Sequence, residues 1–380
     1  MIYFDNSATT KPYKEVIDSF VKVSTDYFGN PSSLHGIGGQ AEKLLSQARH
    51  QVAQLLKVRA GEVYFTSGGT ESNNLAIKGT ALMYRNRGRH IITTSVEHAS
   101  VKETMNQLSD LGFRITYLPV DQSGRISLLD LENAICHDTI LVSIIHVNNE
   151  IGTIQPIEEI GKLLKEYPKI LFHVDHVQGI GKVPLDFFQC RLDFCSISGH
   201  KFHGVKGTGV LYIREGVTIS PLFSGGNQEW KQRSGTENVA GMVALAKALR
   251  MTMEQSENKL SDMATIKNFL IKELNSIEQI VLNTPEEHSA PHIINFSIRG
   301  VRGEVFVHAL EEFGVYVSTT SACSSKKQAV SHTLLAMNVP KDLAEGSIRI
   351  SLSFENTLEE ATKVVNALKM AVQKLSEVLK

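Results

Sequence analysis

The chain has 380 residues, 42% hydrophobic and 21% charged, and its 39 basic and 40 acidic residues leave a net charge of −1, which argues against general electrostatic binding to nucleic acid or membranes. Four cysteines are too few for a disulfide framework in so long a chain, and no apolar run approaches the roughly 18 residues of a membrane span. The first residues lack the basic region and apolar core of a signal peptide, so we expect a protein of the reducing cytoplasm.

The first part of the chain contains a motif that suits phosphate binding. The spacing of apolar residues predicts helices over about 15–27 and 41–56 and a strand over 62–66. That strand runs into Ser67-Gly68-Gly69-Thr70 and then into a helix, whose free N–H groups and dipole favour an anion. Thr70 and Glu71 could equally serve as a helix cap, so the motif alone leaves both interpretations open.

Polar residues follow the ends of several buried strands in the middle of the chain. Strands are predicted over 90–94, 114–118, 139–145, 170–174 and 192–197, with a further strand over 210–213. Because they alternate with helices, we expect an α/β fold with a mostly parallel, doubly wound sheet and a site at the carboxyl ends of its strands. The residues at those ends are His98, Asn149, Asp175, Gln178 and Lys201.

Lys201 and Asp175 suit pyridoxal phosphate chemistry. Lys201 stands in a Gly-rich turn just past a buried strand, where α/β enzymes place reactive groups. The alternative is that Lys201 is an ordinary surface lysine in a hairpin loop, because the same sequence pattern would fit it. In pyridoxal phosphate enzymes a lysine forms a Schiff base with the cofactor aldehyde, and a carboxylate pairs with the pyridinium nitrogen. Lys201 and Asp175 supply these two groups.

The last third of the chain predicts a smaller α+β domain. A glycine-rich loop over 223–238 is followed by helices over about 239–250 and 260–276, with a polar boundary near 255–260. Strands then follow over 280–282, 293–298, 315–317 and 348–352, with helices over 304–312 and 358–379. We assign 15–257 to a large cofactor-binding domain, and 1–14 with 258–380 to a small domain that carries Cys323.

Cys323 is the cysteine most suited to chemistry. It lies in the small, polar stretch 318–327, which we expect to be an exposed and mobile loop, and two nearby lysines favour its thiolate. An incidental surface cysteine is the alternative, but exposed free cysteines are generally avoided because they oxidise. We interpret Cys190 and Cys195 as core residues and Cys136 as structural or incidental, and we expect no metal site.

Motifs along nearly the whole chain resemble the cysteine desulfurase family, within the class V aminotransferase fold of pyridoxal phosphate enzymes. The stretches that carry the resemblance are Asp5-Asn-Ser-Ala-Thr-Thr10, 28–35, 65–76, 96–98, 146–152, 173–175, Ser198-Gly-His-Lys201, 233–238 and 321–323. The resemblance implies a large domain with a mostly parallel sheet of the seven-stranded type sandwiched by helices, plus a smaller α+β C-terminal domain. The stretch around Cys323 is similar to the branch with a long cysteine loop, which contains housekeeping and nitrogenase-type sulfur donors.

The resemblance also implies a role for individual residues. For the cofactor ring, Lys201 is similar to the Schiff-base lysine, Asp175 to the partner of the pyridine nitrogen, Gln178 to the partner of the ring oxygen, and His98 to a stacking and acid–base group. The groups implied to hold the phosphate are Gly69, Thr70, Ser198 and His200, with Thr236 reaching it from the other subunit of a homodimer. Asn149 and Arg349 resemble the groups that bind the substrate carboxylate, for which the planar fork of arginine is suited.

The reaction that the resemblance implies is the conversion of L-cysteine to L-alanine, with the sulfur taken by Cys323 as a persulfide and passed to an acceptor protein. Iron–sulfur cluster assembly, tRNA thiolation and thiocofactor synthesis all use such donors. An aminotransferase or selenocysteine lyase on the same fold, or a sulfur-relay scaffold with little catalysis, are the alternatives. Departures from the family pattern stand at His176, Val205 and Ser353-Phe354.

Overall fold

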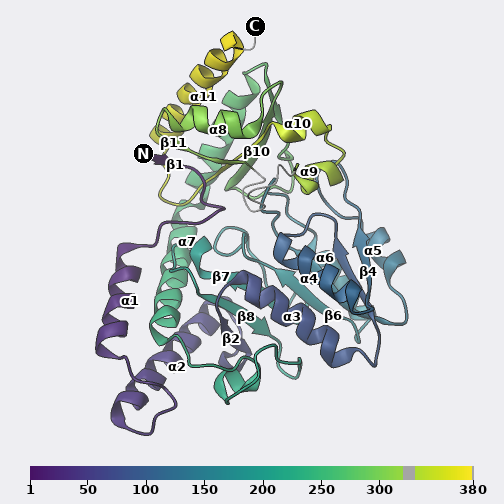
Figure 1. Ribbon diagram of the computed structural model, residues 1–380, viewed down its shortest axis with the longest axis vertical. Helices are drawn as coiled ribbons and strands as arrows, with labels where there is room; N and C mark the ends of the chain where they lie inside the picture. Colours follow the sequence, from purple (N-terminus) through teal and green to yellow (C-terminus); the bar gives the residue numbers. More distant parts are fainter. Residues whose placement is uncertain (320–329, 379–380) are drawn as a thin grey trace.

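The computed structural model describes residues 1–319 and 330–378. Figure 1 shows a helix-flanked central sheet in the lower part of the molecule and a smaller part above it that contains the C-terminus. The long helix α7 (Val239–Asn275) runs from one part to the other. Cys323 lies outside the described residues.

The central sheet has seven strands in the order β2-β8-β7-β6-β5-β3-β4. Neighbouring strands are parallel except for β8, which is antiparallel to both β2 and β7. This arrangement confirms the predicted α/β fold with a mostly parallel sheet. The strands are β2 (Val63–Thr66), β3 (His90–Thr94), β4 (Arg114–Leu118), β5 (Thr139–Ile145), β6 (Leu171–Asp175), β7 (Phe194–Ser198) and β8 (Gly209–Ile213).

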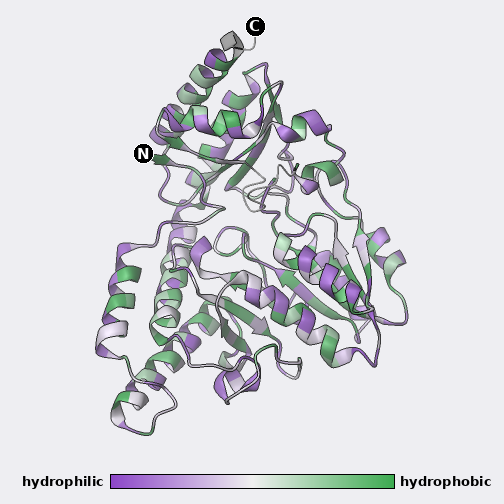
Figure 2. Cartoon of the chain, in the orientation of Figure 1, coloured by the Kyte–Doolittle hydropathy of each residue, from purple (hydrophilic) through white to green (hydrophobic). Residues whose placement is uncertain are grey.

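Both faces of this sheet are covered by helices, because its inner strands are apolar on both sides. Every residue of β3, β5, β6, β7 and β8 is buried. Much of the central sheet has the colour of hydrophobic residues in Figure 2. Ile91 belongs to the hydrophobic cluster that includes residues of α3 and α4 on one face. Its neighbour Ile92 belongs to the cluster on the other face, which includes residues of α1, α2, α5, α6 and α7. The helices of this part are α1 (Lys14–Asp26), α2 (Gly36–Leu56), α3 (Gly69–Tyr84), α4 (Ala99–Asp110), α5 (Leu128–Ala134) and α6 (Ile157–Leu163).

The smaller part has its own hydrophobic core around an antiparallel sheet in the order β12-β13-β10-β9. The N-terminus joins this part, because β1 (Ile2–Tyr3) pairs with β11 (Val315–Tyr316) and Phe4 is buried in the same core. Its other elements are β9 (Ile280–Leu282), β10 (Ile293–Ile298), β12 (Ser318–Thr319), β13 (Ser347–Ser351), α8 (Gly303–Glu311), α9 (His332–Ala336), α10 (Lys341–Glu345) and α11 (Leu358–Val378). The division into domains at 257 and 258 stays a prediction, and it falls inside α7.

One expectation about this region is wrong: the two helices predicted over 239–250 and 260–276 are the single helix α7. The polar stretch between them contains neither glycine nor proline, and Arg250 pairs with Glu254 one turn later along the helix. Thr252 is buried and donates to the Phe202 carbonyl at 3.0 Å, so the helix keeps a packed face there. Among the described residues no helix combines the length and apolarity needed to cross a membrane.

The residues that depart from the family pattern are packed inside the fold. His176 is buried with its Nδ1 2.7 Å from His146 Nδ1, and its ring meets Phe187 edge-on. Val205 packs against the core of the central sheet, and Phe354 is buried in the core of the smaller part. Cys190 and Cys195 are buried in the central core, which confirms their interpretation as core residues.

Candidate active site

A cavity of about 570 Å³ opens at the carboxyl end of the central sheet, within the size range of small-molecule sites. The N-terminal segment forms one wall of it through Ala8 and Thr9. Most residues singled out from the sequence line this cavity, namely Gly69, Thr70, His98, Asn149, Asp175, Gln178, Ser198, His200 and Lys201. They come from segments far apart in the chain, and the parallel sheet brings them to one edge.

Lys201 lies at the end of the short 3-10 helix Gly199–Lys201, directly after β7. Its Nζ donates a hydrogen bond to the Ala8 carbonyl at 2.9 Å and another to the Ser7 carbonyl. The backbone of this turn packs so closely that a Cβ on Gly199 would lie 2.3 Å from Thr208 Oγ1, and the position therefore requires glycine. The N-terminal segment therefore holds the lysine side chain at the cavity wall.

Asp175 is the last residue of β6 and is 4% exposed. Its Oδ1 accepts a hydrogen bond from the Val177 N–H at 3.0 Å, and its Oδ2 accepts one from Asn73 Nδ2 at 2.7 Å. Asn73 Nδ2 also donates to Ser100 Oγ at 2.9 Å. Asn73 is itself 1% exposed, so it links the carboxylate to α4 within the protein interior.

His98 is the residue immediately before α4, and its Nδ1 accepts a hydrogen bond from the Ser100 N–H at 3.1 Å. The same Nδ1 is 2.8 Å from Ser100 Oγ, which completes a chain from His98 through Ser100 and Asn73 to Asp175. Because Nδ1 accepts from the backbone, the ring proton of neutral His98 resides on Nε2. Burial lowers the pKa of His98, while the Asp175 carboxylate opposes that shift.

The start of α3 lies against the cavity, and its glycines let the backbone come close to neighbouring groups. Gly68 has φ of +151°, and a Cβ on Gly69 would lie 2.7 Å from Val177 Cγ2. Glu71 accepts from the Ser67 N–H at 2.9 Å and so stabilises the turn before α3, but among the described residues no side chain caps the helix at Gly68. Thr70 instead lines the cavity, next to a helix start whose dipole favours negative charge.

His200 and Lys206 add a neutral and a positive group to the same wall. Burial, together with the positive charges of Lys201 and Lys206, lowers the pKa of His200 to about 4. His200 Nδ1 lies 3.2 Å from Thr9 Oγ1. Behind the wall, the buried Lys182 donates to the Lys201 carbonyl at 3.2 Å, and burial and the Lys201 charge lower the pKa of Lys182 to about 8.

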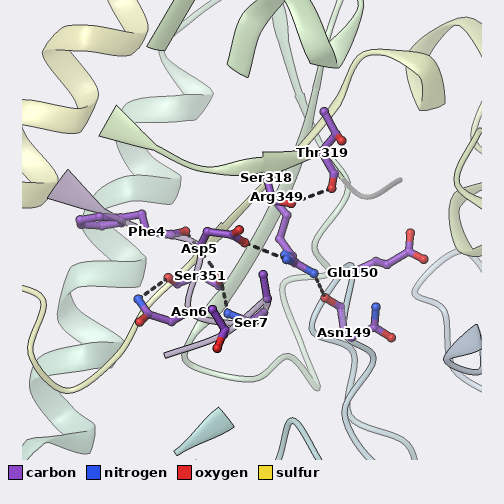
Figure 3. A network of polar contacts seen from close by, with 12 residues as sticks. Phe4, Asp5, Asn6, Ser7, Asn149, Glu150, Ser318, Thr319, Arg349 and Ser351 are labelled. Atoms are coloured by element: carbon purple, nitrogen blue, oxygen red, sulfur yellow. Dashed lines mark hydrogen bonds and ion pairs between the residues drawn. The ribbon is translucent and has the colours of Figure 1, made fainter. Parts of the chain in front are cut away.

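Arg349 lies on β13 of the smaller part, is 4% exposed, and contacts the cavity wall through Asn149. One guanidinium nitrogen donates to the Asn149 carbonyl at 2.8 Å, and another donates to Asp5 Oδ1 at 2.9 Å (Figure 3). Among the described residues, Arg349 Nε is buried without a hydrogen-bond partner. Burial raises the pKa of Asp5, and Arg349 opposes that shift.

Three of the predicted site residues do not line the cavity in the described structure, and of these Arg349 contacts its wall through the Asn149 carbonyl. Thr236 lies in the loop before α7 and is exposed, and Cys323 lies outside the described residues. Asn73, Ser100, Asp5 and Lys206 were not singled out from the sequence. A signal existed for Asn73, which follows Gly69 and Thr70 by about one helical turn and therefore shares their side of α3.

This fold and site define a known class: the chain belongs to the aminotransferase class-V family, whose model matches residues 2–364. It is 50% identical over 380 residues to the "NifS/IcsS protein homolog" of Lactobacillus delbrueckii subsp. bulgaricus, covering 100% of this chain and 99% of the relative. It is 44% identical to "Cysteine desulfurase IscS" of Dictyoglomus turgidum, covering 98% of this chain and 95% of the relative. A solved structure titled "NIFS-LIKE PROTEIN" superposes with a TM-score of 0.93 at 40% identity, covering 98% of this chain and 99% of that one.

Proposed function

We propose that this protein is a cysteine desulfurase that converts L-cysteine to L-alanine and takes the sulfur on Cys323. The observation that carries the proposal is the convergence of Lys201, Asp175 and His98 on one cavity that also meets the start of α3. The relatives named cysteine desulfurase, at identities above 40% over nearly the whole chain, support the same activity.

The residues around the cavity fit pyridoxal phosphate. A Cβ on Gly69 would fill the approach to the helix start, where Thr70, Ser198 and His200 offer further polar groups to a phosphate. In the same cavity Asp175 would offer a buried carboxylate to the pyridine nitrogen, Gln178 its amide to the ring oxygen, and His98 its ring for stacking. When bound, the cofactor supplies an electron sink for the bond that breaks at the substrate Cα.

The chain's own groups would bind the substrate and move its protons. Arg349 would bind the carboxylate of L-cysteine beside Asn149, and its Nε is a buried donor with no partner among residues 1–319 and 330–378. Lys201 Nζ would take the proton from the substrate Cα, and the carbonyls of Ser7 and Ala8 hold that nitrogen in reach of the cavity. His98, neutral with its proton on Nε2, would act as an acid–base group.

The transfer of sulfur to Cys323 forms one bond and breaks one bond. The Cys323 thiolate attacks the substrate sulfur, so that an S–S bond forms while the C–S bond breaks. The electron pair of the broken bond stays on carbon, which is protonated and leaves as alanine. Cys323 keeps the sulfur as a persulfide and passes it to an acceptor protein, in iron–sulfur cluster assembly or tRNA thiolation.

The assembly we propose is a homodimer of the cytoplasm in which Thr236 of one chain completes the phosphate site of the other. The support is the exposed position of Thr236 in a loop anchored by a buried ion pair. Glu229, in the same loop, pairs with Arg49 at 2.6 Å and accepts from the Phe65 N–H at 2.9 Å. The loop is therefore held to α2 and β2 through Glu229, while Thr236 is exposed.

The test combines cofactor binding with product analysis. Purified wild type and Cys323→Ala are compared for the absorbance of lysine-bound pyridoxal phosphate, and then for alanine and sulfide released from L-cysteine. We expect both proteins to bind the cofactor and only the wild type to release sulfur. Unchanged turnover in Cys323→Ala would move the assignment to another reaction on this fold, and absence of the cofactor band would contradict the proposed site itself.

A further inference from the structure

A second cluster of chemically active side chains lies at the amino end of the same sheet, where β3, β4 and β5 begin. His90 is the first residue of β3, and Cys136 and Asp138 lie in the segment that leads into β5. Cys136 Sγ is 3.0 Å from His90 Nδ1 and 3.0 Å from Asp138 Oδ1. One ligand atom from each of the three residues lies within 4.8 Å of the other two.

The imidazole of His90 is oriented as metal ligands are. His90 is 0% exposed, and its Nε2 lies 2.8 Å from Thr116 Oγ1 on β4. A histidine that binds a metal through one nitrogen commonly uses the other to donate a hydrogen bond, which fixes the tautomer. In the tautomer that donates Nε2–H to Thr116, Nδ1 carries a lone pair, and it lies 2.7 Å from Thr139 Oγ1 and 3.0 Å from Cys136 Sγ, so a metal bound there displaces the Thr139 contact.

A positive group already occupies the point where the thiol and the carboxylate meet. Arg114 donates one guanidinium nitrogen to Cys136 Sγ at 2.9 Å and to Asp138 Oδ1 at 2.8 Å. The side chain of Arg114 is 54% exposed, and ion pairs at such positions contribute little free energy. The cluster therefore favours positive charge, and its present cation can leave into solvent at small cost.

We propose that His90, Cys136 and Asp138 form a binding site for a thiophilic divalent cation, Zn²⁺ foremost. Thiolate, imidazole and carboxylate together suit zinc, and three protein ligands with a water in the fourth position are a common zinc geometry. On binding, the Cys136 thiol releases its proton to solvent and Arg114 leaves the cluster. The ion then ties the start of β3 to the segment before β5, so it stabilises this edge of the sheet.

The experiment uses full-length, cofactor-loaded protein in a Cys323→Ala background, so that no sulfur signal comes from Cys323. After treatment with a chelator, the protein is titrated with Co²⁺ and the visible bands of tetrahedral cobalt are followed. Zn²⁺ affinity is then measured by competition with a coloured chelator. We expect strong tetrahedral bands and stoichiometric binding of one ion per chain.

Four substitutions distinguish this site from unspecific binding. Cys136→Ser should weaken binding by more than about a hundredfold, and Asp138→Asn by about tenfold, because each removes a ligand. Arg114→Ala should tighten binding about fivefold, since the competing cation is gone. His137→Gln is the matched control, because His137 is exposed between two of the ligands and should leave the affinity unchanged.

The proposal fails if Co²⁺ produces no tetrahedral bands, or if bands and Zn²⁺ affinity are the same in Cys136→Ser as in its parent. Both readouts are spectroscopic and need no turnover. A protein without desulfurase activity could still bind zinc here, and an active one could lack the site.

Discussion

Both ends of the central sheet carry histidine, carboxyl and cationic side chains, yet they arrange them differently. At the carboxyl end, Lys201, Asp175 and His98 stand around a cavity of about 570 Å³, and each is held by a neighbour while it faces open space. At the amino end, His90 and Cys136 contact one another directly. In this fold, the polar residues at the carboxyl end line a cavity that can hold a small molecule, whereas those at the amino end mainly contact each other.

The largest effect should come from Lys201 at the carboxyl end. Lys201→Ala removes both the amine that would hold the cofactor and the base at the substrate Cα, so alanine formation should fall by at least about a thousandfold. Lys14→Ala is the control, because Lys14 is exposed and pairs only with Asp18 on its own helix among the contacts shown. Subunit association is measured in parallel by light scattering and should not change. Normal turnover in Lys201→Ala would contradict the proposed function.

Asn73 should give the next largest effect, because it lines the cavity and holds the Asp175 carboxylate. Asn73→Ala removes a hydrogen bond to the buried Asp175 carboxylate and the link to Ser100, a loss that corresponds to about tenfold to a hundredfold in rate. We expect the fall in kcat with little change in KM, and a shifted pH profile, because Ser100 Oγ loses its donor and Asp175 loses a hydrogen bond, so both groups that act on His98 change. A merely structural role would lower stability and leave that profile in place.

Asn74→Ala provides the matched control for this prediction. Asn74 is the next residue of α3, and its side chain donates only to the Thr70 carbonyl of its own helix among the contacts shown. Its replacement should leave kcat within about twofold of wild type, as is usual for an exposed intrahelical contact. Equal losses of kcat in the two variants would mean that the rate depends on the integrity of helix α3 and not on the hydrogen bonds of the Asn73 amide.

At the amino end, the same kind of substitution should affect stability instead of rate. His90→Ala leaves a cavity and removes the partner of Thr139 Oγ1 at 2.7 Å and of Thr116 Oγ1 at 2.8 Å, so the free energy of unfolding should drop by about 2–3 kcal/mol. Urea unfolding in the presence of a chelator measures the drop without a contribution from metal. A tenfold loss of kcat at unchanged stability would break the distinction between the two ends.

The smallest effect is a pH dependence that arises between the two ends, at His173 on β6. Burial lowers the pKa of His173 to about 3, and both ring nitrogens contact serine hydroxyls, of Ser143 and Ser196. Since the pKa in the unfolded chain is about 6.5, the contribution of His173 to stability is complete above that pH and is lost as the pH falls toward 3. Urea midpoints should therefore fall between about pH 7 and pH 5.

His173→Gln tests the origin of that dependence. The variant should be less stable than wild type at neutral pH. On acidification its free energy of unfolding should fall less steeply, because unfolding of the variant takes up at most one proton fewer than unfolding of wild type. The comparison is made at matched ionic strength, because salt screens the charges on the surface. An identical acid slope in the two proteins would assign the dependence to other histidines.

Much of the fold was predictable from the sequence because it depends on local pattern. The strands that end at Asp175 and before Lys201 are short apolar runs bounded by polar residues, and they were predicted within a residue or two. The polar stretch near 255–260 misled the prediction, because surface composition alone does not end a helix. What ends one is glycine, proline or a cap, and α7 has none of these there.

The sequence by itself determined the α/β class, the resemblance to a family, and the residues that follow the strand ends. Only the tertiary structure decided which of these groups touch: Asn73 with Asp175, Asp5 with Arg349, and His90 with Cys136. The physical reason is that periodicity specifies which face of an element is buried, but not the packing partner that covers it. A hydrogen bond between residues 344 positions apart, as in Asp5 and Arg349, depends on how two sheets are placed in space, and no local pattern encodes that placement.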